Sequence, residues 1–312
     1  MDRIKLLFIT KDFSNHVERS SYYLSQELAK RTDLMLWSKD GGILDILERI
    51  PKRPDFILVN DFKPDYSPFI RKLRQSPVPT GIIMHDLKYK IRQRKRFIEQ
   101  EGIRHIFSIY RDPFYRYYPE YAERMIWLPH HVPLSIFKDY GEEKTIDWLM
   151  TGAIYPHIYP LRNKMYHALM RECGFRYIPH PGYRNIGKRE TGVYVGQNYA
   201  RLLNRSKIVL TCASVEQFPV LKYYEAAACG ALLLATVNQE ISDLGFIDGQ
   251  TMVAINEHNF VEKAKYYLQH EDERRRIAEN GMALIRSRHS TAKRAEELVQ
   301  AIHNIIEEGK SR

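Results

Sequence analysis

The sequence contains few cysteines and no long hydrophobic run. Its three cysteines, Cys173, Cys212 and Cys229, are odd in number and scattered, which excludes a disulfide framework and a Cys-x-x-Cys pair. The longest apolar runs, such as residues 226–235, reach about ten residues, whereas a membrane-spanning helix needs roughly 20. The first ten residues are charged and strand-like and do not predict a secretory signal. We therefore expect a cytoplasmic location, with Cys212 and Cys229 as small core residues.

Glycine and proline are also sparse, at 16 and 15 of 312 residues, which excludes fibrous and low-complexity chains. Aromatic residues make up 12% of the chain, which is too many for a disordered protein. The length exceeds what one core comfortably supports and suits two domains of ordinary size.

Positive charge is in excess and unevenly spread. The net charge is +10, and residues 1–140 carry 25 Lys and Arg against 18 Asp and Glu. Residues 88–96 are the most basic segment, with six cations in nine positions. This balance favours an anionic partner: a nucleotide, a nucleic acid, a phospholipid surface or an acidic glycan.

Short apolar runs alternate with helical patterns in both halves of the chain. The alternation indicates parallel α/β sheets whose strands are buried on both faces. Strands are expected at residues 5–10, 34–37, 55–60, 81–85, 103–110, 146–151, 207–211 and 231–235. Helices are expected at residues 17–31, 161–172, 223–229, 260–270, 272–287 and 291–308.

The pattern restarts after the proline-containing segment 125–133, which predicts two domains. We expect a first Rossmann-like domain over residues 1–140 and a second over residues 141–290, facing a central cleft. The final helix, residues 291–312, is free to cross back and brace the first domain. In such sheets, ligands bind at the carboxyl ends of the strands.

Residues 214–236 form the most informative stretch. A loop follows the strand at residues 207–211, and Pro219 or Val220 is expected to open a helix whose free N–H groups suit a phosphate. Lys222 adds positive charge in the first turn, and Glu225, three residues later, could accept hydrogen bonds from two ribose hydroxyls. Gly230 is expected to end the helix. A plain crossover helix with a weak surface ion pair explains the same spacing.

Several ordered segments of the second half resemble those of a known family. They are TGA at residues 151–153 with YPLR at 159–162, HPGY at 180–183, YARLLNRSK at 199–207, KYYEAAACG at 222–230 and RSRHSTAKR at 286–294. Together they resemble the donor-binding half of GT-B glycosyltransferases, especially the CgeB-like (spore maturation protein) group of the glycosyltransferase family 1/4 superfamily. The resemblance covers residues 127–300 and is weaker in the first half.

The resemblance implies a nucleotide-sugar donor, UDP-linked by family habit, held by the second domain without a metal or a separate cofactor. It implies that Glu225 binds the ribose and that Tyr183 lies near the nucleobase. The backbone of Phe218, Pro219 and Val220 would face the pyrophosphate.

Two further residues complete the implied donor site. Gly152 would permit close approach of the donor, and Arg162 would join Lys222 in neutralising phosphate charge. Arg162 as a buried structural residue remains an equal alternative. The superfamily also has a Glu eight residues before the ribose-binding Glu, but Gln217 stands there and Glu216 lies one position earlier. Either Glu216 takes the role of the first acid, in a longer loop, or Gln217 replaces it.

The first half offers candidates for handling the acceptor. His85 and Asp86 follow the strand at residues 81–85, where a base or an orienting group could act, although Asp86 also suits a helix N-cap. Other candidates lie after neighbouring strands or near the domain crossing: Asp12, His16, Arg19, Arg111, Asp112, His130 and His131. Asp112 is expected to cap a helix, and the two histidines to line a cleft or pack.

These patterns together predict a hexosyltransferase-type enzyme that moves sugar to a hydroxyl of a cell-surface glycan, glycolipid or protein. A glycosyltransferase acting on nucleic acid bases and an inactive nucleotide-sugar-binding protein are the alternatives. The basic segment 88–96 has a thin apolar stripe, which fits a solvated face, an anionic membrane surface at the inner leaflet or an anionic acceptor.

Overall fold

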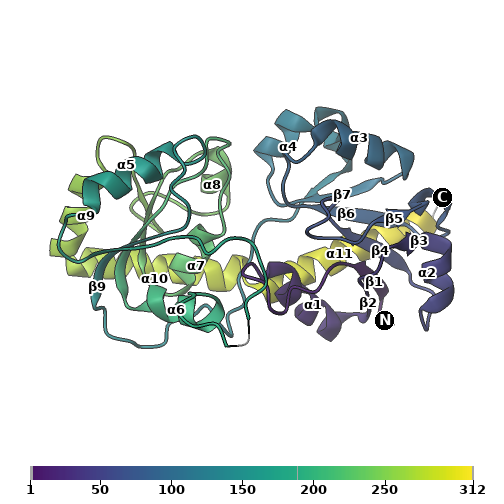
Figure 1. The fold of residues 1–312 in the computed structure, drawn as a ribbon, viewed down its shortest axis with the longest axis horizontal. Coiled ribbons are helices and arrows are strands. Elements are labelled where there is room, and N and C mark those ends of the chain that lie inside the picture. Colours follow the sequence, from purple (N-terminus) through teal and green to yellow (C-terminus); the bar gives the residue numbers. More distant parts are fainter. Residues whose placement is uncertain (1–2, 188, 311–312) are drawn as a thin grey trace. The chain divides into compact units, whose positions relative to one another are not determined.

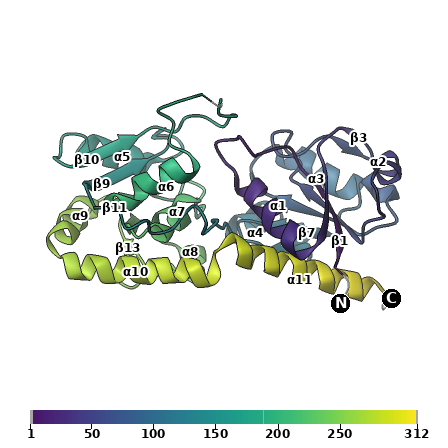
Figure 2. The ribbon, with the colours of Figure 1, turned by 90° about the horizontal axis from the view of Figure 1, so that it is seen from below.

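The computed structural model describes residues 3–187 and 189–310, which divide into two α/β units (Figure 1). Unit 1 extends to Pro129 and resumes at Thr291, and unit 2 runs from His130 to Ser290. The chain returns to unit 1 between its last two helices (Figure 2).

Unit 1 is built on a parallel six-stranded sheet in the order β2-β1-β4-β6-β7-β8. A small two-stranded sheet pairs β3 with β5. The helices α1 and α11 pack against each other on one side of the large sheet, and α3 and α4 lie on the other (Figure 1). The elements are β1 (Lys5–Ile9), α1 (Ser20–Arg31), β2 (Asp33–Trp37), β3 (Gly41–Gly42), α2 (Ile43–Arg49), β4 (Phe56–Asn60), β5 (Ile70–Arg71), β6 (Thr80–Met84), α3 (Ile91–Gln100), β7 (His105–Ser108), α4 (Asp112–Tyr117), β8 (Met125–Trp127) and α11 (Thr291–Lys310).

Unit 2 contains a parallel five-stranded sheet in the order β10-β9-β11-β12-β13. Helix α7 packs against α6 and α10, and α5 packs against α9. The elements are β9 (Ile146–Thr151), α5 (Pro160–Leu169), β10 (Phe175–Ile178), α6 (Gly196–Asn204), β11 (Ser206–Leu210), α7 (Lys222–Ala228), β12 (Leu232–Ala235), α8 (Gln239–Asp243), β13 (Val253–Ala254), α9 (Phe260–Gln269) and α10 (Glu271–Arg288).

The expected strands are confirmed, and the sequence missed β8, β10 and β13 in the large sheets and the two-residue strands β3 and β5. The central strands β1, β4, β6, β9, β11 and β12 are almost wholly buried, so they appear as continuous apolar runs. The three strands missed in the large sheets, β8, β10 and β13, all lie at sheet edges, and β8 and β10 are only half-buried. An edge strand carries polar residues and therefore gives a weak hydrophobic signal.

The chain enters unit 2 at His130, earlier than the boundary at residue 140 that the sequence suggests. The ring of His130 packs edge-on against Tyr224, with ring centroids 5.9 Å apart. The backbone N–H of Tyr140 donates to Asn204 Oδ1 at 2.8 Å, and the Asn204 amide donates to the carbonyl of Lys138 at 2.5 Å. These contacts attach residues 130–140 to unit 2.

Candidate functional site

Each sheet has one point where the strand order reverses. In unit 2 this point lies between β9 and β11, and in unit 1 between β1 and β4. Loops that leave two neighbouring strands in opposite directions open a crevice at their carboxyl ends, and ligands of open α/β sheets bind there. Gly152 and the loop at residues 211–221 follow the unit 2 strands, and Asn60 with Asp61 follows β4.

Gly152 makes room for two cations at the reversal point of unit 2. Its φ of +99° belongs to the region that favours glycine. A Cβ added there would lie 2.8 Å from Cε of Lys222 and 3.3 Å from Nη1 of Arg162. The backbone angle therefore favours glycine, and a larger residue would also displace the end of the Lys222 side chain.

Arg162 is buried and held by unit 2 itself. Its Nη1 donates to the carbonyl of Ala153 at 2.9 Å, and its Nη2 donates to Thr211 Oγ1 and to the carbonyl of Cys212, both at 3.2 Å. Its guanidinium also stacks 3.9 Å from the ring centroid of Tyr159. Arg162 thus ties the loop after β9 to the loop after β11, and its charge remains uncompensated by any carboxylate in these contacts.

Lys222 is a cation in an environment that disfavours its charge. Burial and repulsion by Arg162 lower the pKa of Lys222 to about 8, against the opposing effect of Glu225. Burial, Lys222 and Arg162 likewise lower the pKa of His180 to about 4. No hydrogen bond or ion pair joins the Lys222 ammonium to any residue in the described part of the chain. The cluster of Arg162, His180 and Lys222 is therefore electropositive.

The loop before α7 supplies free N–H groups beside this cluster. Helix α7 begins at Lys222 with Leu221 as its N-cap, so the prediction that Pro219 or Val220 opens the helix is wrong. The reason is a tight turn: the N–H groups of Tyr223 and Tyr224 bond three residues back, to Val220 and Leu221. Within residues 3–187 and 189–310, the N–H groups of Val220, Leu221 and Lys222 have no acceptor.

Gly230 ends α7 as the sequence predicts. Its φ is +69°, and the N–H of Ala231 bonds back to the carbonyl of Ala226. Nζ of Lys144 donates a hydrogen bond to the carbonyl of Gly230 at 2.9 Å, just beyond the end of the helix.

Glu225 is buried on α7, one turn after Lys222. Its charge helps, after burial, to raise the pKa of Tyr199 well above the usual value. The hydroxyl of Tyr199 lies 2.9 Å from that of Thr151, at the end of β9. Glu225 is therefore a buried carboxylate close to the reversal point. The alternative of a weak surface ion pair with Lys222 does not fit this burial.

The remaining predicted donor residues lie on loops around this cluster. Tyr183 is 75% exposed and its ring centroid lies 4.6 Å from that of His180. Pro219 is buried and Phe218 is partly buried. The exposed ring of Tyr183 therefore lies beside the electropositive cluster, next to the ring of His180.

Glu216 and Gln217 lie in the turn between β11 and α7. The N–H of Glu216 donates to Ser214 Oγ at 3.2 Å, and Gln217 adopts a positive φ of 62°. The carbonyl of Gln217 accepts from the side chain of Asn238 at 2.9 Å. The turn is fixed by these bonds, and the role of Glu216 as the first acid stays a prediction.

In unit 1, His85 and Asp86 follow β6 and are both partly buried. The Asp86 carboxylate accepts from Lys63 Nζ at 3.4 Å, and its carbonyl accepts from Arg94 Nη1 at 2.5 Å. Helix α3 begins at Ile91 after Lys90, so Asp86 is not its N-cap. A turn separates Asp86 from the helix, which leaves its carboxylate with Lys63.

A buried ion pair in unit 1 was not foreseen. Asp61 and Arg94 have no exposed side-chain surface, and Arg94 Nη2 lies 2.8 Å from Asp61 Oδ1. The carboxylate also accepts from the N–H groups of His85 at 2.8 Å and Phe62 at 2.6 Å. Burial opposes ionisation of Asp61, but Arg94, His85 and these donors outweigh it and hold its pKa below the usual value. Its position directly after the strand 55–60 was the signal in the sequence.

Two of the six cations of the basic segment 88–96 have acidic partners. Arg94 is buried against Asp61, and Lys95 pairs with Glu120 at 2.6 Å. The exposed cations that remain are Lys88, Lys90, Arg92 and Arg96.

Other predicted candidates have local structural partners. Asp12 accepts from the N–H of Ser14, and Arg19 Nε donates to the carbonyl of His16, all within one loop. Arg111 stacks on Trp127 and pairs with Asp112. Asp112 is the first residue of α4 and Arg111 is its N-cap, so the expectation that Asp112 caps the helix is wrong. His131 is buried, so both it and His130 fit the packing role expected of them.

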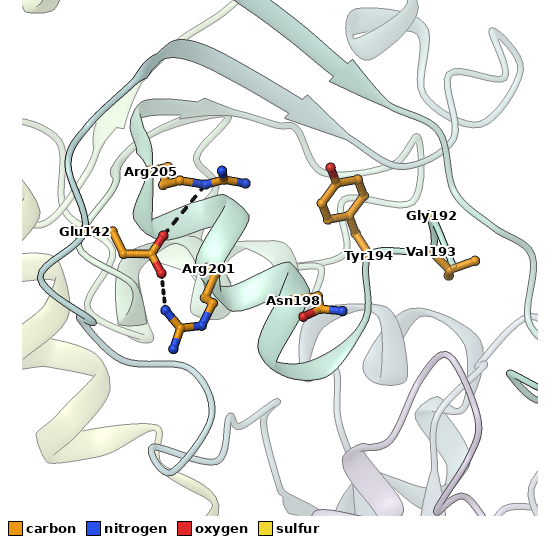
Figure 3. Close-up of a pocket in the computed structure, with 7 residues that line it drawn as sticks. All are labelled: Glu142, Gly192, Val193, Tyr194, Asn198, Arg201 and Arg205. Atoms are coloured by element: carbon orange, nitrogen blue, oxygen red, sulfur yellow. Dashed lines mark hydrogen bonds and ion pairs between the residues drawn. The ribbon is translucent and has the colours of Figure 1, made fainter. Parts of the chain in front are cut away.

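A pocket of about 390 Å³ lies in unit 2 beside α6 (Figure 3). Glu142 pairs there with Arg201 and lies 3.7 Å from Arg205 Nε. The rest of the lining is formed by residues 192–194 and Asn198. None of the predicted donor residues lines it. Its charges are already paired, so it differs from the cluster around Lys222.

Two features are absent from residues 3–187 and 189–310. No helix there is long and apolar enough to cross a bilayer. No group of three or more His, Cys, Asp or Glu side chains there could hold a metal ion.

Comparisons with known proteins agree with the fold predicted from the sequence. Residues 162–300 match a family model described as glycosyl transferase-like. No curated protein matches the chain.

Solved structures match the chain over nearly its whole length. Sucrose-phosphate synthase from Thermosynechococcus elongatus is 13% identical over 97% of this chain and 99% of its own, with a TM-score of 0.68. HepE from Anabaena, solved with UDP and glucose, is 11% identical over 96% and 99%, with a TM-score of 0.64. A glycosyltransferase from Rickettsia africae is 11% identical over 98% and 99%, with a TM-score of 0.63. At these identities the likeness is one of fold: the chain has the α/β GT-B fold with two Rossmann-like units, as the sequence predicts.

Proposed function

We propose that this protein is a glycosyltransferase that transfers a sugar from a nucleotide-sugar donor, UDP-linked, to a hydroxyl acceptor. The observation that carries the proposal is the arrangement around Lys222 in unit 2. Among the described residues, the Lys222 ammonium has no hydrogen-bond partner and the N–H groups of Val220, Leu221 and Lys222 have no acceptor, at the reversal point of a parallel sheet. A diphosphate supplies both the charge and the acceptors that these groups lack.

The match of residues 162–300 to a glycosyl transferase-like family supports this assignment. So does the similarity in fold to Anabaena HepE, which has been solved with UDP-glucose. In this proposal Glu225 binds the ribose, and Tyr183 with His180 lies toward the nucleobase.

The chemistry asked of unit 2 is stabilisation of the leaving diphosphate. As the bond from the anomeric carbon to the diphosphate breaks, negative charge grows on the departing oxygen. Preorganised N–H groups and a lysine ammonium stabilise such charge strongly in a partly dry site. This contribution is made by the residues of the chain alone.

Unit 1 supplies the acceptor side in this proposal, with His85 and Asp86 as the groups that contact the acceptor hydroxyl. The acceptor class we favour is a glycan, a glycolipid or a protein hydroxyl. Peripheral attachment to an anionic membrane through Lys88, Lys90, Arg92 and Arg96 is part of the same proposal.

The test is release of nucleoside diphosphate from a panel of UDP-, GDP- and ADP-sugars, with and without glycan acceptors. Turnover of a UDP-sugar supports the proposal, and binding without any turnover would reduce the protein to a nucleotide-sugar binder. Glu225→Gln should weaken UDP binding about tenfold in calorimetry, because a charged hydrogen-bond acceptor for the ribose is lost. Glu257→Gln, an exposed change in the same unit, is the matched control; equal affinities for the two variants would remove the ribose assignment.

A further inference from the structure

Four polar side chains of unit 1 form a chain of hydrogen bonds that ends at His85. They lie at the carboxyl ends of β1, β4 and β6 and on α1. Asn60 is the centre: it is fully buried and contacts Thr10, Ser21 and His85. Neither the proposed function nor the family comparison assigns Asn60 a role.

The hydrogen-bond partners fix the orientation of the Asn60 amide. Thr10 donates its hydroxyl proton to the carbonyl of Lys11 at 3.1 Å, so its oxygen is left to accept. The Asn60 Nδ2 group therefore faces Thr10, at 2.8 Å, and it also donates to Ser21 Oγ at 3.0 Å. With both amide protons used, Oδ1 of Asn60 must face His85, 2.7 Å from its Nε2.

An amide oxygen only accepts hydrogen bonds, so Nε2 of His85 must carry a proton. The ring cannot turn to avoid this contact, because it stacks on Tyr66 with centroids 4.3 Å apart and planes 7° apart. Tyr66 in turn stacks on the buried Phe13, at 5.5 Å.

The surroundings of His85 keep it neutral. Burial lowers its pKa, and the charge of Arg94 acts in the same direction. The carboxylates of Asp61, Glu18 and Asp86 face the ring and act in the opposite direction, without reversing the shift. A neutral imidazole with its proton on Nε2 has a lone pair on Nδ1, and this atom has no hydrogen-bond partner in the described part of the chain.

We propose that Asn60 is a positioning residue: it holds His85 in the Nε2–H tautomer, so that Nδ1 accepts a hydrogen bond from a substrate hydroxyl. The contact with a hydroxyl rests on the proposed function, whereas the tautomer does not. Asn60 acts only through His85 and touches no substrate itself.

The tautomer can be measured without any substrate. Two-dimensional ¹H–¹⁵N correlation of ¹⁵N-histidine-labelled protein, with His85→Gln to assign the signals, reports which ring nitrogen carries the proton. We expect Nε2–H in the wild-type protein and a mixture of both tautomers in Asn60→Leu. An Nδ1–H tautomer in the wild type, or an unchanged tautomer in a folded Asn60→Leu variant, would overturn the proposal.

Asn60→Asp keeps the shape and the acceptor, and it covers the case in which Asn60→Leu does not fold. A carboxylate beside Nε2–H stabilises the imidazolium and should raise the pKa of His85. The protonated ring has no lone pair on Nδ1, so the rising limb of the kcat/KM profile should move to higher pH. Asn304→Asp, the same change on the exposed face of α11, is the control and should leave the profile in place.

The outcomes separate this inference from the proposed function. If the NMR result is as expected but no nucleotide sugar is turned over, the proposed function fails and the tautomer assignment stands. If turnover is found and the rising limb is the same in Asn60→Asp as in Asn304→Asp, the positioning role of Asn60 is wrong.

Discussion

The two units treat buried charge in opposite ways. In unit 1, Arg94 is completely buried and meets Asp61 at 2.8 Å, and backbone N–H groups of His85 and Phe62 also donate to the Asp61 carboxylate. Nη1 of Arg94 donates to the carbonyl of Asp86 and to the hydroxyl of Tyr118. In unit 2, Arg162 and Lys222 lie together, and Arg162 bonds only to neutral carbonyl and hydroxyl oxygens. Glu225 is the one acid that raises the pKa of Lys222, and it does not restore that pKa to its usual value.

This difference separates a structural charge from a functional one. The charges of a buried ion pair neutralise each other, and removing one partner leaves the other charge buried and uncompensated. An uncompensated buried cation destabilises the free protein, and binding of an anion removes this destabilisation. The comparison is consistent with the proposed ligand-binding role of Lys222 and with a structural role for Arg94.

The largest effect expected from this comparison is on Arg94. Arg94→Met leaves the Asp61 carboxylate buried without its cation and should destabilise the protein by about 3–5 kcal/mol. Arg96→Met, an exposed change on the same helix, should stay within about 0.5 kcal/mol. Urea unfolding followed by tryptophan fluorescence measures both. A loss for Arg94→Met no greater than for Arg96→Met would mean that the pair is not structural.

The features of the structure that depend on local sequence patterns could be predicted from the sequence. The continuous apolar runs predicted the central strands because both faces of each sheet are covered. Gly230 was recognisable because a helix end needs a positive φ, which glycine adopts most readily. Gly152 and Lys222 were found through their order along the chain, in the segments that resemble a known family.

The rest depends on the register of neighbouring strands. Asn60 reaches His85 only because β4 and β6 pair with Asn60 beside Ile83, and Arg94 reaches Asp61 across 33 residues of chain. The start of α7 at Lys222 depends on the tight turn at Val220 and Leu221, whereas the sequence offered Pro219 as the obvious first residue.

A smaller effect is expected at Gly152. Gly152→Ala places a Cβ 2.8 Å from Lys222 Cε in a backbone conformation that costs a non-glycine residue about 1–3 kcal/mol. The variant should lose stability and also nucleotide affinity, because Lys222 must move. Gly249→Ala is the matched control, since its φ is +70° and nothing lies within 4 Å. Thermal unfolding and UDP titration of both variants separate the backbone strain from the contact; if UDP affinity is the same in both, Lys222 is not positioned by this contact.

The smallest expected effect is the uptake of a proton when the donor binds. Because the pKa of free Lys222 is about 8, the residue is largely neutral at pH 8.5, and a bound diphosphate should restore its charge. Binding of UDP-glucose at pH 8.5 should then take up roughly three-quarters of a proton, and the uptake through Lys222 should vanish toward pH 6.5, where the free lysine is already charged. Calorimetry in buffers of different ionisation enthalpy measures this. The same uptake in Lys222→Met would assign the proton to another group.

The central claim is that unit 2 binds a nucleoside diphosphate through Lys222 and the N–H groups that precede it. Calorimetric titration with UDP and UMP, for the wild-type protein and Lys222→Met, tests it most directly. The wild type should bind UDP at least about tenfold more tightly than UMP, because charge-assisted bonds to the second phosphate contribute about 1.5–3 kcal/mol. Lys222→Met should lose most of that preference. Equal affinities of the wild type for UDP and UMP, or a preference that survives in Lys222→Met, would contradict the account.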